Sequence, residues 1–227
     1  NGNNYDEIKI NRVNYIKPLN YNIPSDISSS AFFIVLTVLM NNSELLIRNV
    51  NVNSSRTGII TILRKMGVKI IFKNRKIYKG EKNADIKVFS PKVIKSINCP
   101  SKLNSGAIDE FLLLFLVAAK AKGVSYFKNL GELNQKESPR LDIAVNILKK
   151  IGIKVERKLN NIKIYGDPGL NLKGTYIIKD FRKDHRIFMM SCIAALVFGG
   201  NWKIHNKDSV NSSFPNFFKI LKYLRKK

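Results

Sequence analysis

The sequence is poor in cysteine and histidine, and these shortages narrow the chemistry open to it. Only two cysteines, Cys99 and Cys192, and two histidines occur in 227 residues. The cysteines lie far apart and outside any metal or redox spacing, which argues against a disulfide framework and for the reducing cytoplasm. The sequence contains no phosphate loop, dinucleotide-binding fingerprint, metal-ligand cluster or nucleophile elbow. It thus offers none of the usual signatures of metal or nucleotide chemistry.

Long apolar runs and a cleavable leader are also lacking. The two longest apolar runs cover residues 111–119 and 187–198, whereas a membrane-spanning helix needs about 20 residues. We read both runs as buried helices and expect no membrane association. No signal peptide is recognisable. Because the first residue is Asn1 rather than methionine, we expect the chain to be a piece of a longer protein.

Acidic residues are scarce. The sequence has 16 of them against 40 lysines and arginines, which gives a formal net charge of +24. Such an excess often marks a nucleic-acid-binding protein. Here the lysines are spread along the whole chain, and asparagine and isoleucine are abundant with them, as A- and T-rich codons would produce. We therefore read the charge as codon bias with some attraction for anionic substrates, and we do not expect a nucleic-acid partner.

An internal repeat of roughly 75–80 residues is the strongest organisational signal that is present. Each unit begins with an apolar helix and continues through a strand and a polar loop to a second helix. In the first unit we expect helices over residues 26–40 and 56–66 and strands over 44–49 and 68–72. In the second unit we expect helices over 107–121 and 139–151 and strands over 124–129 and 153–156. In the third unit we expect helices over 186–198 and 214–224 and a strand over 201–205.

This alternation of helices and strands places the chain in the α/β class, with sheets packed on helices. The third unit is incomplete because it stops on its second helix, so we expect strands from elsewhere to close it. Ahead of the first unit, residues 8–10 are predicted to form a strand, and Lys17 and Pro18 mark a linker.

The starts of the predicted helices are the places to look for chemistry, because free N–H groups and the helix dipole bind anions there. Asp109 opens a helix that is otherwise apolar. It could be an N-terminal cap, which aspartate performs well, or a carboxylate base at the edge of an apolar wall. The sequence leaves both interpretations open.

Two further helix starts carry clustered charge. Lys136, Glu137 and Arg140 lie within five residues, either as a solvated turn or as an anion site, since cations there oppose the helix dipole unless an anion is bound. Arg186 follows His185 at the start of the third apolar helix, where it could cap the helix with its acidic neighbour or grip a carboxylate or phosphate with both guanidinium nitrogens.

Six stretches that contain these residues together resemble the 5-enolpyruvylshikimate-3-phosphate synthase family. They are IPSDISSSAFF (23–33), RNVNVNSSRTGIITILRKMG (48–67), AIDEFLLLFLVAA (107–119), KESPRL (136–141), KDHRIFMM (183–190) and SSFPNFF (212–218). Each alone is weak, but they follow the family's order and spacing. The resemblance implies the enolpyruvyl transferase fold, in which a domain has three βαβαββ repeats. It assigns this domain to residues 24–227, with repeats of about 24–100, 101–178 and 179–227, and residues 1–23 to the end of a preceding domain plus a linker.

The resemblance also implies a reaction and roles. Phosphoenolpyruvate would react with the 5-hydroxyl of shikimate 3-phosphate, with release of phosphate, on the shikimate pathway to chorismate and the aromatic amino acids. Asp109 matches the base for the hydroxyl proton, Lys136 a shikimate-phosphate contact and proton relay, and Glu137 the proton shuttle to the methylene carbon. Arg140 and Arg186 match the cations that hold phosphoenolpyruvate, with His185 beside them. No metal or organic cofactor is implied.

The resemblance has departures and alternatives. Asn134 stands where the family usually has arginine, and Pro139 where it usually has aspartate. The chain is expected to need the N-terminal half of the same protein, and the full-length form to be a cytoplasmic monomer. The alternatives are the UDP-N-acetylglucosamine enolpyruvyl transferase, which shares the fold, and a decayed or non-catalytic basic binding module.

Overall fold

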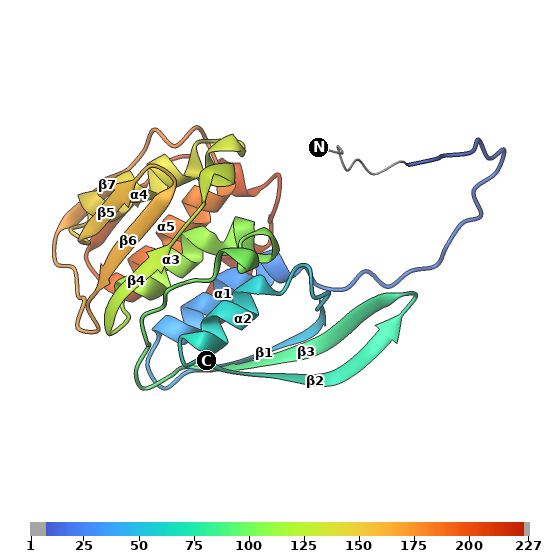
Figure 1. Cartoon of the computed structure of the whole chain (residues 1–227), viewed down its shortest axis with the longest axis horizontal. Helices are drawn as coiled ribbons and strands as arrows, with labels where there is room; N and C mark the ends of the chain where they lie inside the picture. Colours follow the sequence, from blue (N-terminus) through green and yellow to red (C-terminus); the bar gives the residue numbers. More distant parts are fainter. Residues whose placement is uncertain (1–7, 225–227) are drawn as a thin grey trace, which may run out of the picture.

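The computed structural model describes residues 8–224, which form three repeats around a group of long helices (Figure 1). The first repeat contains α1 (Ile27–Leu39), β1 (Glu44–Asn51), α2 (Gly58–Lys65), β2 (Lys69–Tyr78) and β3 (Glu81–Phe89). The second contains the 3-10 turns η1 (Ser101–Leu103), η2 (Ser105–Glu110) and η3 (Gly131–Gln135), with α3 (Phe111–Ala119), β4 (Gly123–Phe127), α4 (Arg140–Lys150), β5 (Val155–Lys158) and β6 (Asn161–Gly166). The third contains β7 (Thr175–Ile178), α5 (His185–Phe198), β8 (Asn201–Ile204), η4 (Lys207–Val210) and α6 (Phe217–Leu224).

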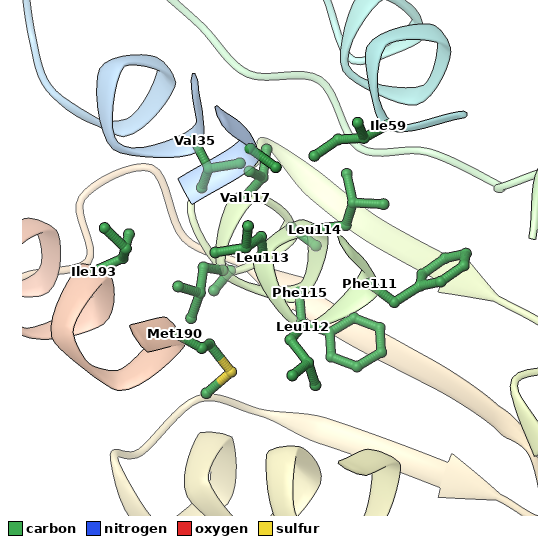
Figure 2. Packing of buried hydrophobic residues seen from close by; sticks show 14 of the residues in the cluster. Val35, Ile59, Phe111, Leu112, Leu113, Leu114, Phe115, Val117, Met190 and Ile193 are labelled. Atoms are coloured by element: carbon green, nitrogen blue, oxygen red, sulfur yellow. The ribbon is translucent and has the colours of Figure 1, made fainter. Parts of the chain in front are cut away.

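The first helices of the three repeats, α1, α3 and α5, pack against one another at the centre. Every residue of α3 is buried, as expected of a helix that is apolar on all sides. Figure 2 shows Leu113 of α3 facing Val35 of α1 and Ile193 of α5. Each such side chain contributes about 1.5–3 kcal/mol when it is fully buried. Among the described residues no helix is both long and apolar enough to cross a membrane.

The three central helices do not begin in the same way. Asp26 caps α1 by accepting a hydrogen bond from the Ser29 N–H at 2.8 Å, as the predicted start implied. The helix predicted over residues 107–121 is shorter, because residues 105–110 form the tighter turn η2 and α3 runs only from Phe111 to Ala119. Tertiary packing sets this turn: a Cβ on Gly58 would lie 2.6 Å from the backbone of Gly106.

The sheets lie outside the helices and repeat one pattern. The first has the order β1-β3-β2 and the second β4-β6-β5, both antiparallel, whereas β7 pairs in parallel with β8. In the first two repeats, parallel bridges at Ser25–Val50 and Asn98–Tyr126 occupy the place of the β7–β8 pairing. Each repeat therefore contains a parallel crossover around its first helix, with two full strands in the third repeat and isolated bridges in the first two. This arrangement agrees with the expected α/β class.

The third repeat is incomplete, as expected. β1 and β4 each have an antiparallel partner on the edge away from the parallel crossover, namely β3 and β6. Within residues 8–224, β8 pairs with β7 alone. One edge of β8 therefore presents backbone N–H and C=O groups without a strand partner in the described chain.

Some of the helix and strand boundaries that the sequence predicted are wrong. Residues 8–10 form no strand; they belong to an exposed arm that leaves the body (Figure 1). Pro139 directly precedes α4 instead of occupying its first position, and α6 begins at Phe217 rather than at residue 214. The strand predicted over residues 68–72 is longer and ends at Tyr78, and the remaining predicted elements agree with the structure to within about two residues at each end.

Candidate active site

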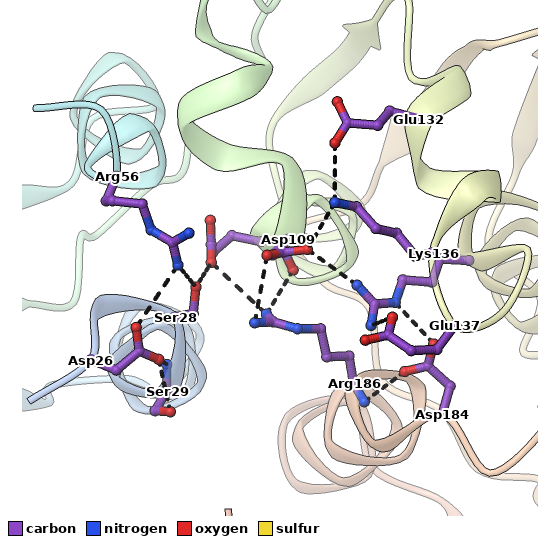
Figure 3. Close-up of polar contacts among 12 residues, drawn as sticks. Asp26, Ser28, Ser29, Arg56, Asp109, Glu132, Lys136, Glu137, Asp184 and Arg186 are labelled. Carbon is purple, nitrogen blue, oxygen red and sulfur yellow. Dashed lines mark hydrogen bonds and ion pairs between the residues drawn. The ribbon is translucent and has the colours of Figure 1, made fainter. Parts of the chain in front are cut away.

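The starts of α3, α4 and α5 bring their charged side chains into one cluster, which continues through Ser28 and Arg56 of the first repeat (Figure 3). The predicted residues Asp109, Lys136, Glu137, Arg140 and Arg186 all belong to this cluster. They come from η2, the turn before α4, and the first turns of α4 and α5. The fold therefore brings Asp109 into contact with Arg186, which lies 77 positions further along the sequence.

Arg140 is a deeply buried cation of the cluster, with a side chain that is 1% exposed. Its Nε lies 2.9 Å from Asp184 Oδ2 and its Nη1 lies 3.2 Å from Asp109 Oδ1, while Nη2 donates to Glu137. A buried guanidinium needs such partners because an unpaired buried charge is strongly destabilising. Arg140 thus links the starts of α3, α4 and α5.

Asp184 holds the start of α5 in place. Its Oδ1 accepts the Arg186 N–H at 2.9 Å, and its Oδ2 accepts the Ser138 hydroxyl at 2.8 Å. Burial by itself would raise the pKa of Asp184, but the hydrogen bond and the charge of Arg140 outweigh burial and lower it. Asp184 is therefore an ionised helix cap, as one interpretation of this start anticipated.

Asp109 lies among three cations. Its carboxylate is 3.2 Å from Arg140 Nη1, 3.7 Å from Lys136 Nζ and 3.8 Å from Arg186 Nη2. Neither η2 nor α3 has a side-chain cap hydrogen bond at its start, so the interpretation of Asp109 as an N-terminal cap is wrong. The side chain is 23% exposed. A carboxylate within reach of solvent and surrounded by cations can accept a proton from a bound hydroxyl.

Arg186 is held less completely than Arg140. Its Nη1 donates to the Asp109 backbone oxygen at 3.0 Å. Its two nearest carboxylates are more distant, Asp109 at 3.8 Å and Glu110 at 3.9 Å. The side chain is 15% exposed. A guanidinium has five N–H donors, so Arg186 retains donor capacity for an anion at the surface of the cluster.

Sequence reasoning gave no role to the part of the cluster that reaches the first repeat, although its residues stand at or near predicted helix starts. The Ser28 hydroxyl donates to buried Glu110, and Arg56 Nη2 donates to Ser28 Oγ at 3.1 Å. Burial is the main influence on Glu110 and raises its pKa, against the lowering effects of the Ser28 hydrogen bond and the Arg186 charge. The available signal was a second carboxylate, directly after Asp109, at the start of an apolar helix.

His185 is half-buried at the first position of α5. Burial lowers its pKa below the usual value for histidine, and the nearby charge of Asp184 opposes this only in part. The imidazole is therefore biased towards its neutral form at neutral pH.

Asn134, where the resemblance led us to expect arginine, has well-defined partners in the structure. Asn134 Nδ2 donates to Asp142 Oδ1 at 2.6 Å, and its Oδ1 accepts the Asp142 N–H at 3.2 Å. Arg157 completes the arrangement with an ion pair to Asp142 at 2.6 Å. These contacts tie η3 to the first turn of α4, so Asn134 anchors the loop that carries Lys136 and Glu137.

Three repeats with converging helix starts define the class of fold found in the enolpyruvyl transferases. The enolpyruvyl transferase NikO from Streptomyces tendae shows this likeness at the level of the fold alone, with a TM-score of 0.60 at 14% identity over 87% of this chain and 42% of that one. Within the class, residues 1–221 match the family described as EPSP synthase (3-phosphoshikimate 1-carboxyvinyltransferase), and the chain belongs to that family.

Individual relatives agree with this membership. The chain is 36% identical to a 3-phosphoshikimate 1-carboxyvinyltransferase of Bacillus pumilus over 90% of its own length and 47% of the relative's. A relative from Thermodesulfovibrio yellowstonii is also 36% identical, over 98% of the chain and 51% of that protein. The solved EPSP synthase of Acinetobacter baumannii gives a TM-score of 0.83 at 35% identity, covering 88% of this chain and 46% of that one. The chain thus spans about half the length of the curated relatives it matches.

Proposed function

We propose that the protein containing this chain transfers the enolpyruvyl group of phosphoenolpyruvate to the 5-hydroxyl of shikimate 3-phosphate and releases phosphate. The observation that carries the proposal is the position of Asp109, a partly exposed carboxylate between Lys136, Arg140 and Arg186. Both substrates are anions, and such a cluster supplies cations for binding next to a base for the hydroxyl.

The proposed roles follow the bonds that change. Asp109 accepts the proton of the 5-hydroxyl while the oxygen of that hydroxyl attacks C2 of phosphoenolpyruvate. Glu137 delivers a proton to the methylene carbon and takes one back from the resulting methyl group when the C2–O bond to phosphate breaks. The departing phosphate carries away the proton that Asp109 accepted, so both carboxylates return to their starting state. Lys136 contacts the shikimate phosphate and relays protons, while Arg140 and Arg186 hold phosphoenolpyruvate.

Glu137 also links anion binding to the chemistry. Arg140 is engaged by three carboxylates, of which Glu137 is the most exposed, at 60%. An incoming carboxylate or phosphate can replace Glu137 at Nη2 with the least disturbance of buried contacts. That exchange would release Glu137 towards the substrate as the anion takes its place. His185, half-buried and biased towards the neutral form, is placed beside this anion.

The proposed site also needs the half of the family's length that this chain does not span. Two features support this: β8 has an open edge among the described residues, and the arm exposes apolar side chains such as Ile8, Ile10 and Ile16. We propose that residues 24–227 form one domain, that residues 1–23 lead from the other, and that the complete protein works as a monomer. The two free thiols fit a reducing, cytoplasmic location.

The alternatives are less well supported. Family membership favours the shikimate substrate over UDP-N-acetylglucosamine. A decayed remnant would have no reason to keep the proposed base, proton shuttle and cations in mutual contact.

The test is an assay of phosphate release by the full-length protein with both substrates, with each omitted in turn. We expect release to require both. Release from phosphoenolpyruvate alone, or no release together with no binding of phosphoenolpyruvate in a calorimetric titration, would contradict the proposal.

A further inference from the structure

The buried carboxyl of Glu110 has no part in the roles proposed above. It lies where the three central helices begin: Glu110 precedes α3, Ser28 is in the first turn of α1, and Arg186 is in the first turn of α5. Its side chain is 4% exposed. A buried carboxyl is costly unless its oxygens find partners, so its surroundings are expected to be closely specified.

The contacts of Glu110 cross from the first repeat to the third. Ser28 donates its hydroxyl to Glu110 Oε1, and Arg186 Nη1 lies 3.9 Å from the same oxygen. On the other side, Ser28 Oγ accepts from Arg56 Nη2 at 3.1 Å, and Arg56 also lies 3.9 Å from Asp26. Glu110 is thus held by the Ser28 hydroxyl from the first repeat, and it contacts Arg186 from the third.

Arg186 has fewer close contacts than Arg140, so its orientation depends more on each neighbour, including Glu110. Arg140 has three carboxylates within hydrogen-bonding distance, whereas Arg186 has one hydrogen bond, from Nη1 to the Asp109 backbone oxygen, and two longer carboxylate contacts. A guanidinium binds a carboxylate or phosphate with two parallel N–H groups only when its plane has the right orientation. Loss of Glu110 would remove one of the few neighbours that fix the plane of the Arg186 guanidinium.

We propose that Glu110 is a positioning residue for Arg186: it fixes the guanidinium plane so that the exposed edge of Arg186 receives a substrate anion, and Ser28 holds Glu110 in place. The identity of that anion as phosphoenolpyruvate rests on the proposed function. The positioning itself does not, so the two can be tested separately.

The first experiment measures orientation without any substrate. In the full-length protein, nitrogen-15 NMR of the arginine side chains reports how fast each guanidinium rotates about its Nε–Cζ bond. We expect Glu110→Ala to speed the rotation of Arg186 several-fold and to leave Arg140 unchanged. Glu110→Gln keeps the size and an oxygen that accepts from Ser28, so it should stay close to the parent. An unchanged Arg186 rotation in Glu110→Ala would overturn the proposal.

The second experiment measures substrate binding with a matched control. Ser28→Ala should raise the KM for phosphoenolpyruvate about tenfold, with kcat and the KM for shikimate 3-phosphate within about twofold of the parent. The control is Ser125→Ala, which removes another buried serine hydroxyl, one that accepts the Ile97 N–H at 3.2 Å in β4. The control should lose similar stability without the change in KM.

Ser28→Ala and Ser125→Ala together test whether Glu110 positions Arg186, even if Glu110→Ala does not fold. Equal KM values in the two, or a fall in kcat together with a rise in both KM values, would overturn the positioning role. If the parent neither turns over nor binds phosphoenolpyruvate, the proposed function fails, and the NMR comparison still decides the role of Glu110.

Discussion

At the scale of single residues, Asp109 is the side chain whose replacement should be most informative. Asp109→Asn keeps the size of the side chain and an acceptor for the Arg140 Nη1 donor at 3.2 Å, but it cannot accept a proton. Because a general base contributes about 10²–10⁴-fold, we expect kcat of the full-length protein to fall by about that factor. A loss smaller than about fivefold in a steady-state assay would contradict the role of Asp109 as the base.

The control for this prediction is a binding measurement, in which phosphoenolpyruvate is titrated into the Asp109→Asn protein. Binding of phosphoenolpyruvate by Asp109→Asn should stay close to the parent, because Arg140 and Arg186 remain in place. A variant that loses both turnover and binding would show that Asp109 organises the cations rather than the proton transfer.

His185 should make stability depend on pH. Burial lowers its pKa in the folded state below the ordinary value of 6.5, so the unfolded chain binds a proton more readily. The stability that the neutral imidazole contributes is complete above pH 6.5 and is lost as the pH falls through the lowered folded-state pKa. His185→Gln should therefore lose less stability than the parent between about pH 8 and about pH 5.

Chemical denaturation of the two proteins at a series of pH values measures this difference. The control is His205→Gln, which replaces the other histidine at an exposed position after β8. Identical pH profiles for the parent and His185→Gln would mean that His185 is as free to protonate in the fold as in the unfolded chain.

The sequence could single out candidate residues because their local context marks them, whereas the contacts that these residues make depend on distant parts of the chain. Asp109 and Arg140 each stand at the start of a predicted helix. Nothing near Arg140 in the sequence reveals that it is fully buried, since Asp184 comes from the next repeat. In the same way, the hydrogen bond between Ser28 and Glu110 joins residues 82 positions apart. Convergence of repeats creates such contacts, and only tertiary structure shows them.

At the scale of elements, the approach of α2 to η2 offers a test of the packing that places Asp109. A Cβ on Gly58 would lie 2.6 Å from the backbone carbon and oxygen of Gly106, where no flexible side chain can give way. We expect Gly58→Ala to destabilise the fold by about 1–3 kcal/mol, as overpacking usually does, despite the better helix propensity of alanine. Denaturant unfolding measures the change in free energy.

Gly169→Ala is the matched control, because its Cβ would meet only the Asp167 carboxylate at 3.4 Å in an exposed turn. Its effect should stay within about 0.5 kcal/mol. Equal effects of the two substitutions would show that α2 and η2 can separate at little cost.

The element boundaries show what a sequence can and cannot specify. Glycines with positive φ, such as Gly67 and Gly152, follow predicted helices as expected, because the left-handed conformation they adopt is a local property. The start of α3 was misplaced, because residues 105–110 take a 3-10 turn that is fitted against α2. The strand predicted over residues 8–10 is absent, and these residues lie in the exposed arm instead.

At the scale of the whole molecule, the open edge of β8 and the position of the charged cluster lead to one prediction. Residues 1–227 alone should show no synthase activity and should be less stable than the complete protein. Within residues 8–224, the edge of β8 has no antiparallel partner of the kind that β1 and β4 have, and exposed edges promote association with other chains. Under the proposed function the cluster forms one wall of the site, and a single wall neither excludes water nor orients two substrates, which is where much of an enzyme's rate originates.

Supplying the other half of the family's length as a separate polypeptide should recover some activity. It would give β8 a partner, cover the cluster, and reduce the self-repulsion that the net charge of +24 adds. The measurement is phosphate release by the chain alone, by the other half alone, and by the mixture. The mixture made with Asp109→Asn is the control and should remain inactive, because complementation restores the walls of the site but not its base. Turnover by the chain alone would mean that the catalytic residues do not depend on a second wall, and the assignment of the site to the junction of two halves would then be wrong.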